Sequence, residues 1–78
     1  MPRLKRLRAK EIIKIFRIFG FEIKSQKGSH VKLARVKTHE QVLIISLHRS
    51  LDVGAIAGIY DQALKYIAEE DLRPHFYI

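Results

Sequence analysis

The chain has 78 residues, which is enough for one small domain, residues 1–78. It has no cysteine, so neither disulfides nor a thiolate metal site can stabilise that domain. Its longest apolar runs are far shorter than the roughly 20 residues that cross a bilayer. The basic start contains Glu11, Lys14 and Arg17 where a signal peptide would be apolar. We therefore expect a cytoplasmic protein with no membrane segment.

The formal net charge of +7 is distributed unevenly along the chain. Residues 1–49 hold 13 lysines and arginines against 3 acidic residues, whereas residues 50–78 hold 2 against 5. A basic surface attracts polyanions, which makes nucleic acid the first partner class to consider. The alternative is that the charge serves only solubility.

Residues 8–20 have the apolar spacing of an amphipathic helix, and Gly20 is placed to end it. Ile15 at the edge of the apolar stripe and Ile18 outside it suggest a contact with a partner or a second copy. The predicted buried stripe consists of Ala9, Ile12, Ile13, Phe16 and Phe19.

Basic residues occupy the opposite face of this predicted helix. Lys10, Lys14 and Arg17 are three and four residues apart, so their side chains stand together. Such a face is either an ordinary solvated surface or a ridge that contacts phosphates.

Three strands are predicted next, and their short connections indicate an antiparallel meander. In residues 21–26 the alternation is that of a half-buried strand, and Lys27-Gly28 supplies the following turn. A polar turn at 37–41 leads to residues 42–47, whose β-branched run predicts a central or well-covered strand. The expected inner set is Phe21, Ile23 and Ser25, then Ser29, Val31 and Leu33, with His30, Lys32 and Ala34 on the outer face.

Asp52 is a predicted N-cap for a second helix that runs from Val53 to Glu69. The apolar stripe of this helix is Val53, Ile56, Ala57, Tyr60, Ala63, Leu64 and Ile67. The fold class is therefore α+β, a two-layer α-β-β-β-α sandwich with both helices on one face of a three-stranded antiparallel sheet. Residues 70–78 form a C-terminal tail that we expect to pack as an arm or an extra strand.

The sequence excludes several kinds of site. Its four histidines, at 30, 39, 48 and 75, lack the spacing of helical metal ligands and have no carboxylate cluster near them, so we expect no metal. No Gly-rich phosphate loop and no Gly-x-Ser-x-Gly motif is present, and we expect no cofactor.

Metal-free RNA cleavage is the most economical chemistry for a small basic protein of this kind. In that reaction a histidine takes the 2′-OH proton or protonates the leaving oxygen, while cations stabilise the phosphorane. His30 follows the predicted turn, with Lys27 beside it and Lys32 on the same strand face. The alternative is a turn histidine whose ring hydrogen-bonds locally.

Two segments carry a resemblance to a known family. RAKEIIKIFRIFGFEIKSQKGSHVKL, residues 8–33, resembles the amino-terminal half of the HicA toxins, also called YcfA-like, of HicAB toxin–antitoxin systems. LIISLHRSLDVGAIAGI, residues 43–59, is similar to their third strand and second helix. The resemblance covers about residues 7–67, and its most specific part is GF followed by QKGSH.

This resemblance implies a double-stranded-RNA-binding-domain-like fold and an mRNA interferase, a ribosome-independent endoribonuclease that needs no metal. It places the catalytic histidine at His30, with Gly28 and Ser29 as supporting turn residues and a supporting role for His48. It also implies a HicB-like antitoxin whose acidic side chains cover the basic active face. From the charges themselves we expect Lys27 and Lys32 to contact phosphate, and the helix face of Lys10, Lys14 and Arg17 to steer RNA.

The sequence departs from the family pattern in four places. Arg8-Ala9 replaces the usual helix start, Val31 follows His30 where a second imidazole or an aromatic ring is common, and no proline precedes His48. The second helix and the tail also run longer, which suggests either a dimer arm, and hence a homodimer through the tail, or an altered antitoxin site. Two alternatives therefore stand beside the toxin: a non-catalytic RNA- or DNA-binding module on the same fold, and an interaction protein that assembles through Ile15, Ile18 and the tail.

Overall fold

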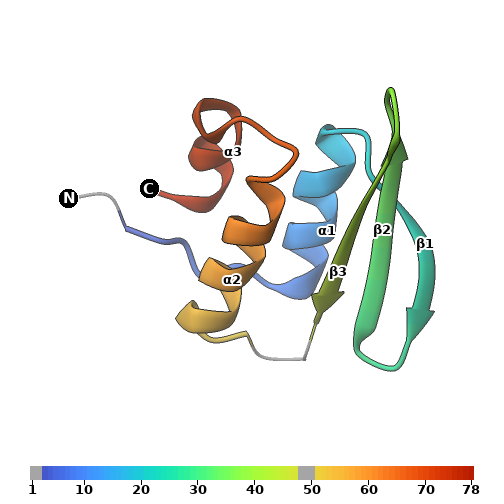
Figure 1. The fold of residues 1–78 in the computed structure, drawn as a ribbon. Helices are drawn as coiled ribbons and strands as arrows, with labels where there is room; N and C mark the ends of the chain where they lie inside the picture. Colours follow the sequence, from blue (N-terminus) through green and yellow to red (C-terminus); the bar gives the residue numbers. More distant parts are fainter. Residues whose placement is uncertain (1–2, 48–50) are drawn as a thin grey trace.

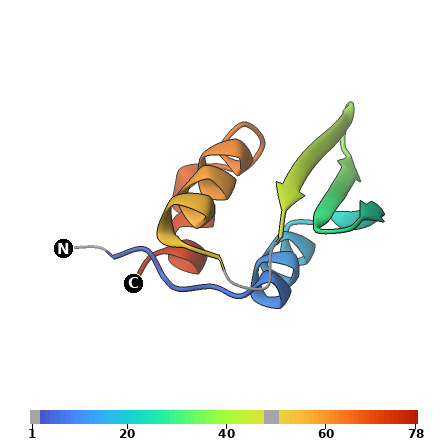
Figure 2. The same ribbon diagram turned by 90° about the horizontal axis from the view of Figure 1, so that it is seen from below.

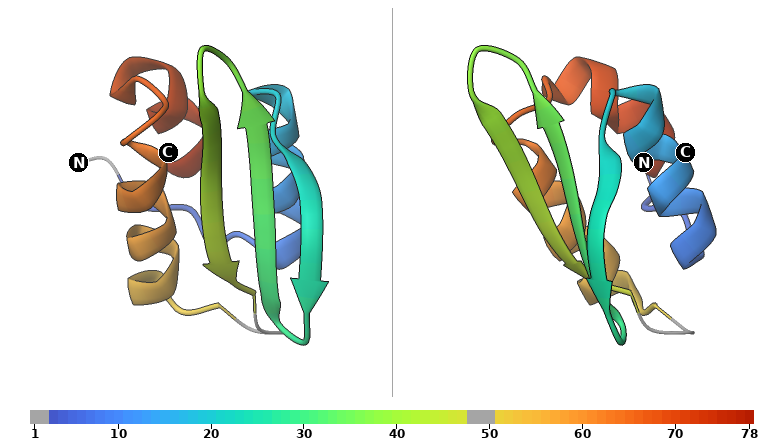
Figure 3. Two further views of the ribbon diagram at one scale, coloured as in Figure 1. Left: turned by 45° about the vertical axis from the view of Figure 1, so that its right-hand side comes forward. Right: turned by 90° about the vertical axis from the view of Figure 1, so that its right-hand side faces the viewer.

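A computed structural model describes residues 3–47 and 51–78 of the protein. The strands form one antiparallel sheet in the order β1-β2-β3, and α1 and α2 pack on the same face of it (Figures 1 and 3). The α+β class and the α-β-β-β-α order are thus confirmed, with a third helix added at the C-terminus. The elements are α1 Ala9–Ile18, β1 Glu22–Lys27, β2 His30–Val36, β3 Glu40–Ser46, α2 Val53–Ala63 and α3 Glu69–Phe76.

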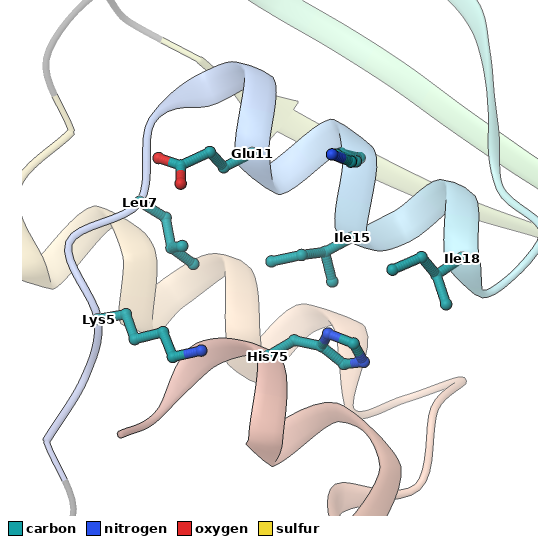
Figure 4. Close-up of a pocket in the computed structure, with 7 residues that line it drawn as sticks. Lys5, Leu7, Glu11, Ile15, Ile18 and His75 are labelled. Carbon is teal, nitrogen blue, oxygen red and sulfur yellow. The ribbon is translucent and has the colours of Figure 1, made fainter.

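Helix α1 begins and ends where the sequence predicts, because both ends have a partner for the backbone. The carboxylate of Glu11 accepts the backbone N–H of Arg8 at 2.9 Å, and Gly20 takes a φ of 91° just past the C-terminus. The expected exposure of Ile15 was wrong, since only 8% of it is accessible, whereas Ile18 is 63% exposed. The N-terminal segment and α3 flank this side of α1 and enclose Ile15 (Figure 4).

The sheet has a buried face toward the helices and an exposed outer face. Val31 and Leu33 of β2 are buried, so His30 and Lys32 point outward as predicted. The assignment of Ser25 to the inner face was wrong, because a β-bulge at Lys24 shifts the register and places Ser25 opposite Lys32 on the outer face. The prediction of a central or well-covered third strand was also wrong, because β3 is an edge strand and Ile44 on its outer face is 61% exposed.

Helix α2 is shorter than predicted. The carboxylate of Asp52 accepts the backbone N–H of Ala55 at 2.7 Å, which confirms the N-cap, but the helix ends at Ala63 rather than at Glu69. The chain then turns and starts α3, whose first turn contains three acidic residues that favour a helix N-terminus.

The C-terminal tail is part of the core and not a free arm or an added sheet strand. Phe76 of α3 is fully buried between Phe16 of α1, at 6.0 Å between ring centroids, and Tyr60 of α2, at 5.3 Å. The N-terminal segment pairs with the end of α3, where the backbone N–H of Lys5 donates to the carbonyl of Phe76 at 2.7 Å. Residues 3–5 and 76–78 therefore lie side by side, as Figures 1 and 2 show.

Arg35 connects the sheet to the helical layer. Its guanidinium donates to the carbonyl oxygens of Phe19 and Tyr66, both at 2.7 Å, and to the side-chain oxygen of Gln41 at 2.6 Å. The same group lies 4.6 Å from the ring centroid of Phe21, and burial lowers its pKa from the ordinary arginine value. This residue fixes β2 relative to the ends of α1 and α2.

Candidate active site

The hairpin between β1 and β2 places His30. Gly28 has a φ of 61° and Ser29 does not have a positive φ, which is the combination of a type II′ turn with glycine at its first central position. A two-residue turn of this kind sets Lys27 directly opposite His30. Gly28 and Ser29 thus occupy the turn between the two strands, and Gly28 supplies the conformation that other residues rarely adopt. Their supporting role at the site stays a prediction.

A polar row crosses the outer face of the sheet at this end, formed by Lys27 of β1, His30 of β2 and Ser46 of β3. Each residue is the register partner of the next, and all three are exposed. The backbone N–H of Leu47 donates to the carbonyl of Ser29 at 2.7 Å, so His30 and Ser46 form a non-hydrogen-bonded pair. Side chains approach each other most closely at such pairs.

Lys32 is the next outward residue of β2 and lies opposite Ile44 of β3. Farther along the outer face, the ammonium of Lys24 contacts the carboxylate of Glu40 at 2.6 Å. That hydrogen bond, together with the charges of Lys24 and Lys32, lowers the pKa of Glu40. Positive charge is therefore concentrated at the His30 end of the outer face, and an ion pair occupies the other end.

The basic face of α1 lies at a different place in the molecule. Lys10, Lys14 and Arg17 line a shallow hollow of about 500 Å³ together with Ile13 and Ile23. Since Ile23 points to the helix side of the sheet, β1 separates this hollow from the polar row. The structure thus brings Lys27 and Lys32 to His30 and keeps the three α1 residues on the other side of β1.

Arg17 is the one of these three α1 residues with an ion-pair partner among the described residues. Its guanidinium lies 3.7 Å from the carboxylate of Glu22, and both side chains are more than half exposed. Water screens such a pair strongly, so Arg17 keeps most of its attraction for a polyanion.

A second hollow of about 300 Å³ lies between the N-terminal segment, α1 and α3 (Figure 4). Its aliphatic floor and cationic rim are on the helical side of the molecule, away from the outer face of the sheet. The residues that line it are Lys5, Leu7, Glu11, Lys14, Ile15, Ile18 and His75.

The other histidines are not part of the described polar row. His39 lies in the turn between β2 and β3, at the opposite end of the sheet, and His75 lies on α3 beside the ring of Phe19. His48 is outside the described residues. Within residues 3–47 and 51–78, no three His, Asp or Glu side chains gather as ligands of a metal ion would.

Sequence reasoning missed Ser46. The residue is sixteen positions from His30 and belongs to no motif, so its place depends on the register between β2 and β3. The signal was available in principle: a tight turn at 37–39 fixes which residues of the two strands face each other, and Ser46 then lies opposite His30.

The fold and the polar row define a small basic α+β protein that exposes one imidazole beside cations on the open face of its sheet. A family model described as HicA toxin of bacterial toxin-antitoxin matches residues 9–64. The chain therefore belongs to the HicA toxin family, which confirms the resemblance found in the sequence. Membership supports a toxin role and implies a cognate antitoxin as partner.

No curated protein and no solved structure matched the chain. None of the helices in the described residues is long and apolar enough to cross a membrane.

Proposed function

We propose that the protein is the toxin of a type II toxin–antitoxin system and that it acts in the cytoplasm as a metal-independent endoribonuclease on mRNA. The observation that carries this proposal is the exposed imidazole of His30 at the end of the β1–β2 hairpin, with Lys27 opposite it, in a member of a toxin family. His30 serves as general acid or base, and the reaction uses no cofactor.

The reaction is an internal transfer at phosphorus. The 2′ oxygen of the RNA forms a bond to the phosphorus while the bond to the 5′ oxygen of the next nucleotide breaks, leaving a 2′,3′-cyclic phosphate and a 5′-hydroxyl. One proton leaves the 2′-OH and one reaches the 5′ oxygen, and His30 carries one of these transfers. Lys27 and Lys32 balance the negative charge that develops on the phosphorane oxygens.

The α1 cations serve binding rather than chemistry. Lys10, Lys14 and Arg17 contact phosphates of the RNA on the far side of β1, so that a strand seated at the polar row continues around the β1 edge. Binding of this kind weakens as salt is added, since each phosphate contact releases counterions. Gly28 and Ser29 shape the turn, and His48 keeps its proposed supporting role.

A HicB-like antitoxin is the proposed protein partner. Its acidic side chains would compete with RNA phosphates for Lys27 and Lys32 at the exposed end of the sheet.

The proposed unit is the single domain 1–78. The homodimer expected through the tail loses its main support, because Phe76 of the tail is buried within its own chain.

The test compares the wild type with His30→Ala and His30→Gln on an end-labelled mRNA in EDTA. We expect cleavage by the wild type and none by either variant, with RNA affinity changed less than threefold. His39→Ala is the matched control, because this histidine lies at the other end of the sheet. A 2′-deoxy nucleotide at the cleaved position must abolish cleavage there. Persistent cleavage by His30→Gln, or an intact RNA with folded wild type free of antitoxin, contradicts the proposal.

A non-catalytic RNA- or DNA-binding module remains the second candidate function. The observation that favours it is that the described part of the polar row contains one imidazole, whereas acid–base cleavage needs two proton transfers. A module of this class would bind RNA or DNA in a salt-dependent way, and His30→Ala would have no cleavage to remove.

A further inference from the structure

We infer that Ser46 is a further catalytic residue, whose hydroxyl donates a hydrogen bond to a non-bridging oxygen of the scissile phosphate. The inference rests on the proposed ribonuclease function and adds a substrate contact to it. Lys27 and Ser46 then hold the phosphate from the two sides of His30. The serine forms and breaks no covalent bond, and its proton stays on the hydroxyl oxygen.

The register of the sheet places Ser46 for this role. His30 lies opposite Lys27 on β1, and on its other side it forms a non-hydrogen-bonded pair with Ser46 on β3. Paired Cβ atoms at such a position are about 4.5–5.5 Å apart. A phosphate that lies within reach of the imidazole is therefore also within reach of the Ser46 hydroxyl.

The position of Ser46 is fixed by contacts on both sides of it. Two residues before it, the backbone of Ile44 makes two hydrogen bonds with the side chain of Gln62 on α2, at 2.8 and 3.0 Å. One residue after it, the backbone N–H of Leu47 bonds to the carbonyl of Ser29 in the hairpin turn. These contacts fix the backbone that carries the Ser46 hydroxyl, and a donor on a fixed backbone needs little reorganisation when charge develops on the phosphate.

The chemistry of the row also fits a phosphate better than another group. Lys27 at one end of the row supplies a cation, and Ser46 at the other end supplies a neutral hydrogen-bond donor. A phosphate bound over the row therefore has a donor on each side and no carboxylate beside it. Two acidic residues have register places on this face, Glu22 and Glu40. Both lie toward the end away from His30, and they are paired with Arg17 and Lys24 respectively.

The first test is the rate of single-turnover cleavage of a short RNA that contains one cleavage site. We expect Ser46→Ala to slow the chemical step by about tenfold to a hundredfold, less than the loss of a buried oxyanion donor, with RNA affinity within twofold of the wild type. Ser46→Thr keeps the hydroxyl and a good strand former, so its rate stays within about threefold. Ser25→Ala is the matched control, because Ser25 is exposed on the same face opposite Lys32.

A sulfur substitution separates phosphate contact from a structural effect. Replacing one non-bridging oxygen of the scissile phosphate by sulfur weakens it as an acceptor. One of the two phosphorothioate diastereomers should slow the wild type, and Ser46→Ala should lose that discrimination. An equal effect of sulfur in both proteins overturns the inference, as does a wild-type cleavage rate in Ser46→Ala.

A binding measurement keeps this inference testable if the wild type does not cut RNA. An uncleavable RNA with a 2′-deoxy nucleotide at the target position is titrated into isotope-labelled wild-type protein. We expect the NMR signals of Ser46, His30 and Lys27 to shift together and the signal of Ser25 to shift less. Shifts at His30 without a shift at Ser46 overturn the contact, whereas absent cleavage with all three shifts overturns only the ribonuclease proposal.

Discussion

The side-chain amide of Gln62 on α2 forms two hydrogen bonds with the backbone of Ile44 on β3. Its oxygen accepts the Ile44 N–H at 2.8 Å, and its nitrogen donates to the Ile44 carbonyl oxygen at 3.0 Å. Since β3 is an edge strand, this glutamine bonds the strand where a fourth strand would do so. One helix side chain thus covers the middle of an edge that would otherwise be open to pairing.

Gln62→Ala should therefore have two consequences. Loss of two neutral hydrogen bonds lowers the free energy of unfolding by about 1–2 kcal/mol, which urea unfolding measures. The uncovered edge also favours association, so light scattering should show a larger mass as the protein concentration rises. Asp61→Ala, at the exposed neighbouring position, should do neither. A monomer at every concentration would contradict the edge-covering role.

Two glycines should respond to alanine in opposite directions. Gly28 has a φ of 61°, so Gly28→Ala strains the turn and should destabilise the protein by about 1 kcal/mol or more. Gly58 lies in α2 with open space around it, and Gly58→Ala should stabilise by about 0.5–1 kcal/mol. Thermal unfolding of the two variants is the measurement, and a shift of the same sign in both would contradict this explanation.

Local pattern was sufficient to predict much of the fold. The period of two in β2 places Val31 and Leu33 inside and His30 outside, and the Lys27-Gly28 turn fixes where the strand begins. The capping chemistry of Asp52 likewise follows from the residues themselves. These features depend on neighbours in the sequence, so the sequence alone predicts them.

The features that were mispredicted depend on distant parts of the chain. The bulge at Lys24 appears only when β1 is aligned with β2, and Ile15 is buried because the N-terminal segment and α3 lie beside it. The apolar spacing continues past Ala63, and no glycine or proline marks the end of α2 there. In each case tertiary packing decided what local preference left open.

The candidate site also has a part that neighbouring residues determine and a part that distant residues determine. The place of His30 next to Lys27 follows from a two-residue turn, whereas its proximity to Ser46 follows from strand register. Lys10, Lys14 and Arg17 were expected to steer RNA, a role that stays a prediction, and their hollow lies on the other side of β1 from His30.

Tyr60 gives the protein a dependence of stability on alkaline pH. Burial raises the pKa of its phenol, and a hydrogen bond from the hydroxyl to the Glu69 carboxylate at 3.2 Å raises it further. The folded protein therefore resists ionisation that the unfolded chain undergoes near pH 10. This contribution is complete below about pH 10 and is lost as the pH rises from there through the folded pKa.

Absorbance near 295 nm, recorded as the difference between wild type and Tyr60→Phe, should show the ionisation of this tyrosine with a midpoint above pH 10. Glu69→Gln removes the carboxylate charge, so its midpoint should move back toward the ordinary value. In urea unfolding, Tyr60→Phe should lose less stability than the wild type between about pH 10 and 11. A midpoint at or below 10 would contradict the burial seen in the structure.

Phe76 tests whether the C-terminal segment belongs to the monomer. Its ring is fully buried against Phe16 and Tyr60, so Phe76→Ala leaves a cavity and should lower the free energy of unfolding by about 3–5 kcal/mol. Phe76→Leu fills most of that space and should cost less than about 1.5 kcal/mol. Urea unfolding of both variants gives the comparison, with His75→Ala as the half-buried neighbouring control.

A dimer arm would behave differently under the same substitutions. In an arm that exchanges between two copies, the Phe76 ring would pack against the partner, and Phe76→Ala would lower the molecular mass in light scattering. Here the contacts of Phe76 are with α1 and α2 of its own chain, and the backbone of Lys5 bonds to its carbonyl oxygen. We therefore expect an unchanged monomer mass together with lost stability, because α3, which lies beyond the family-matched residues 9–64, completes the core of this chain.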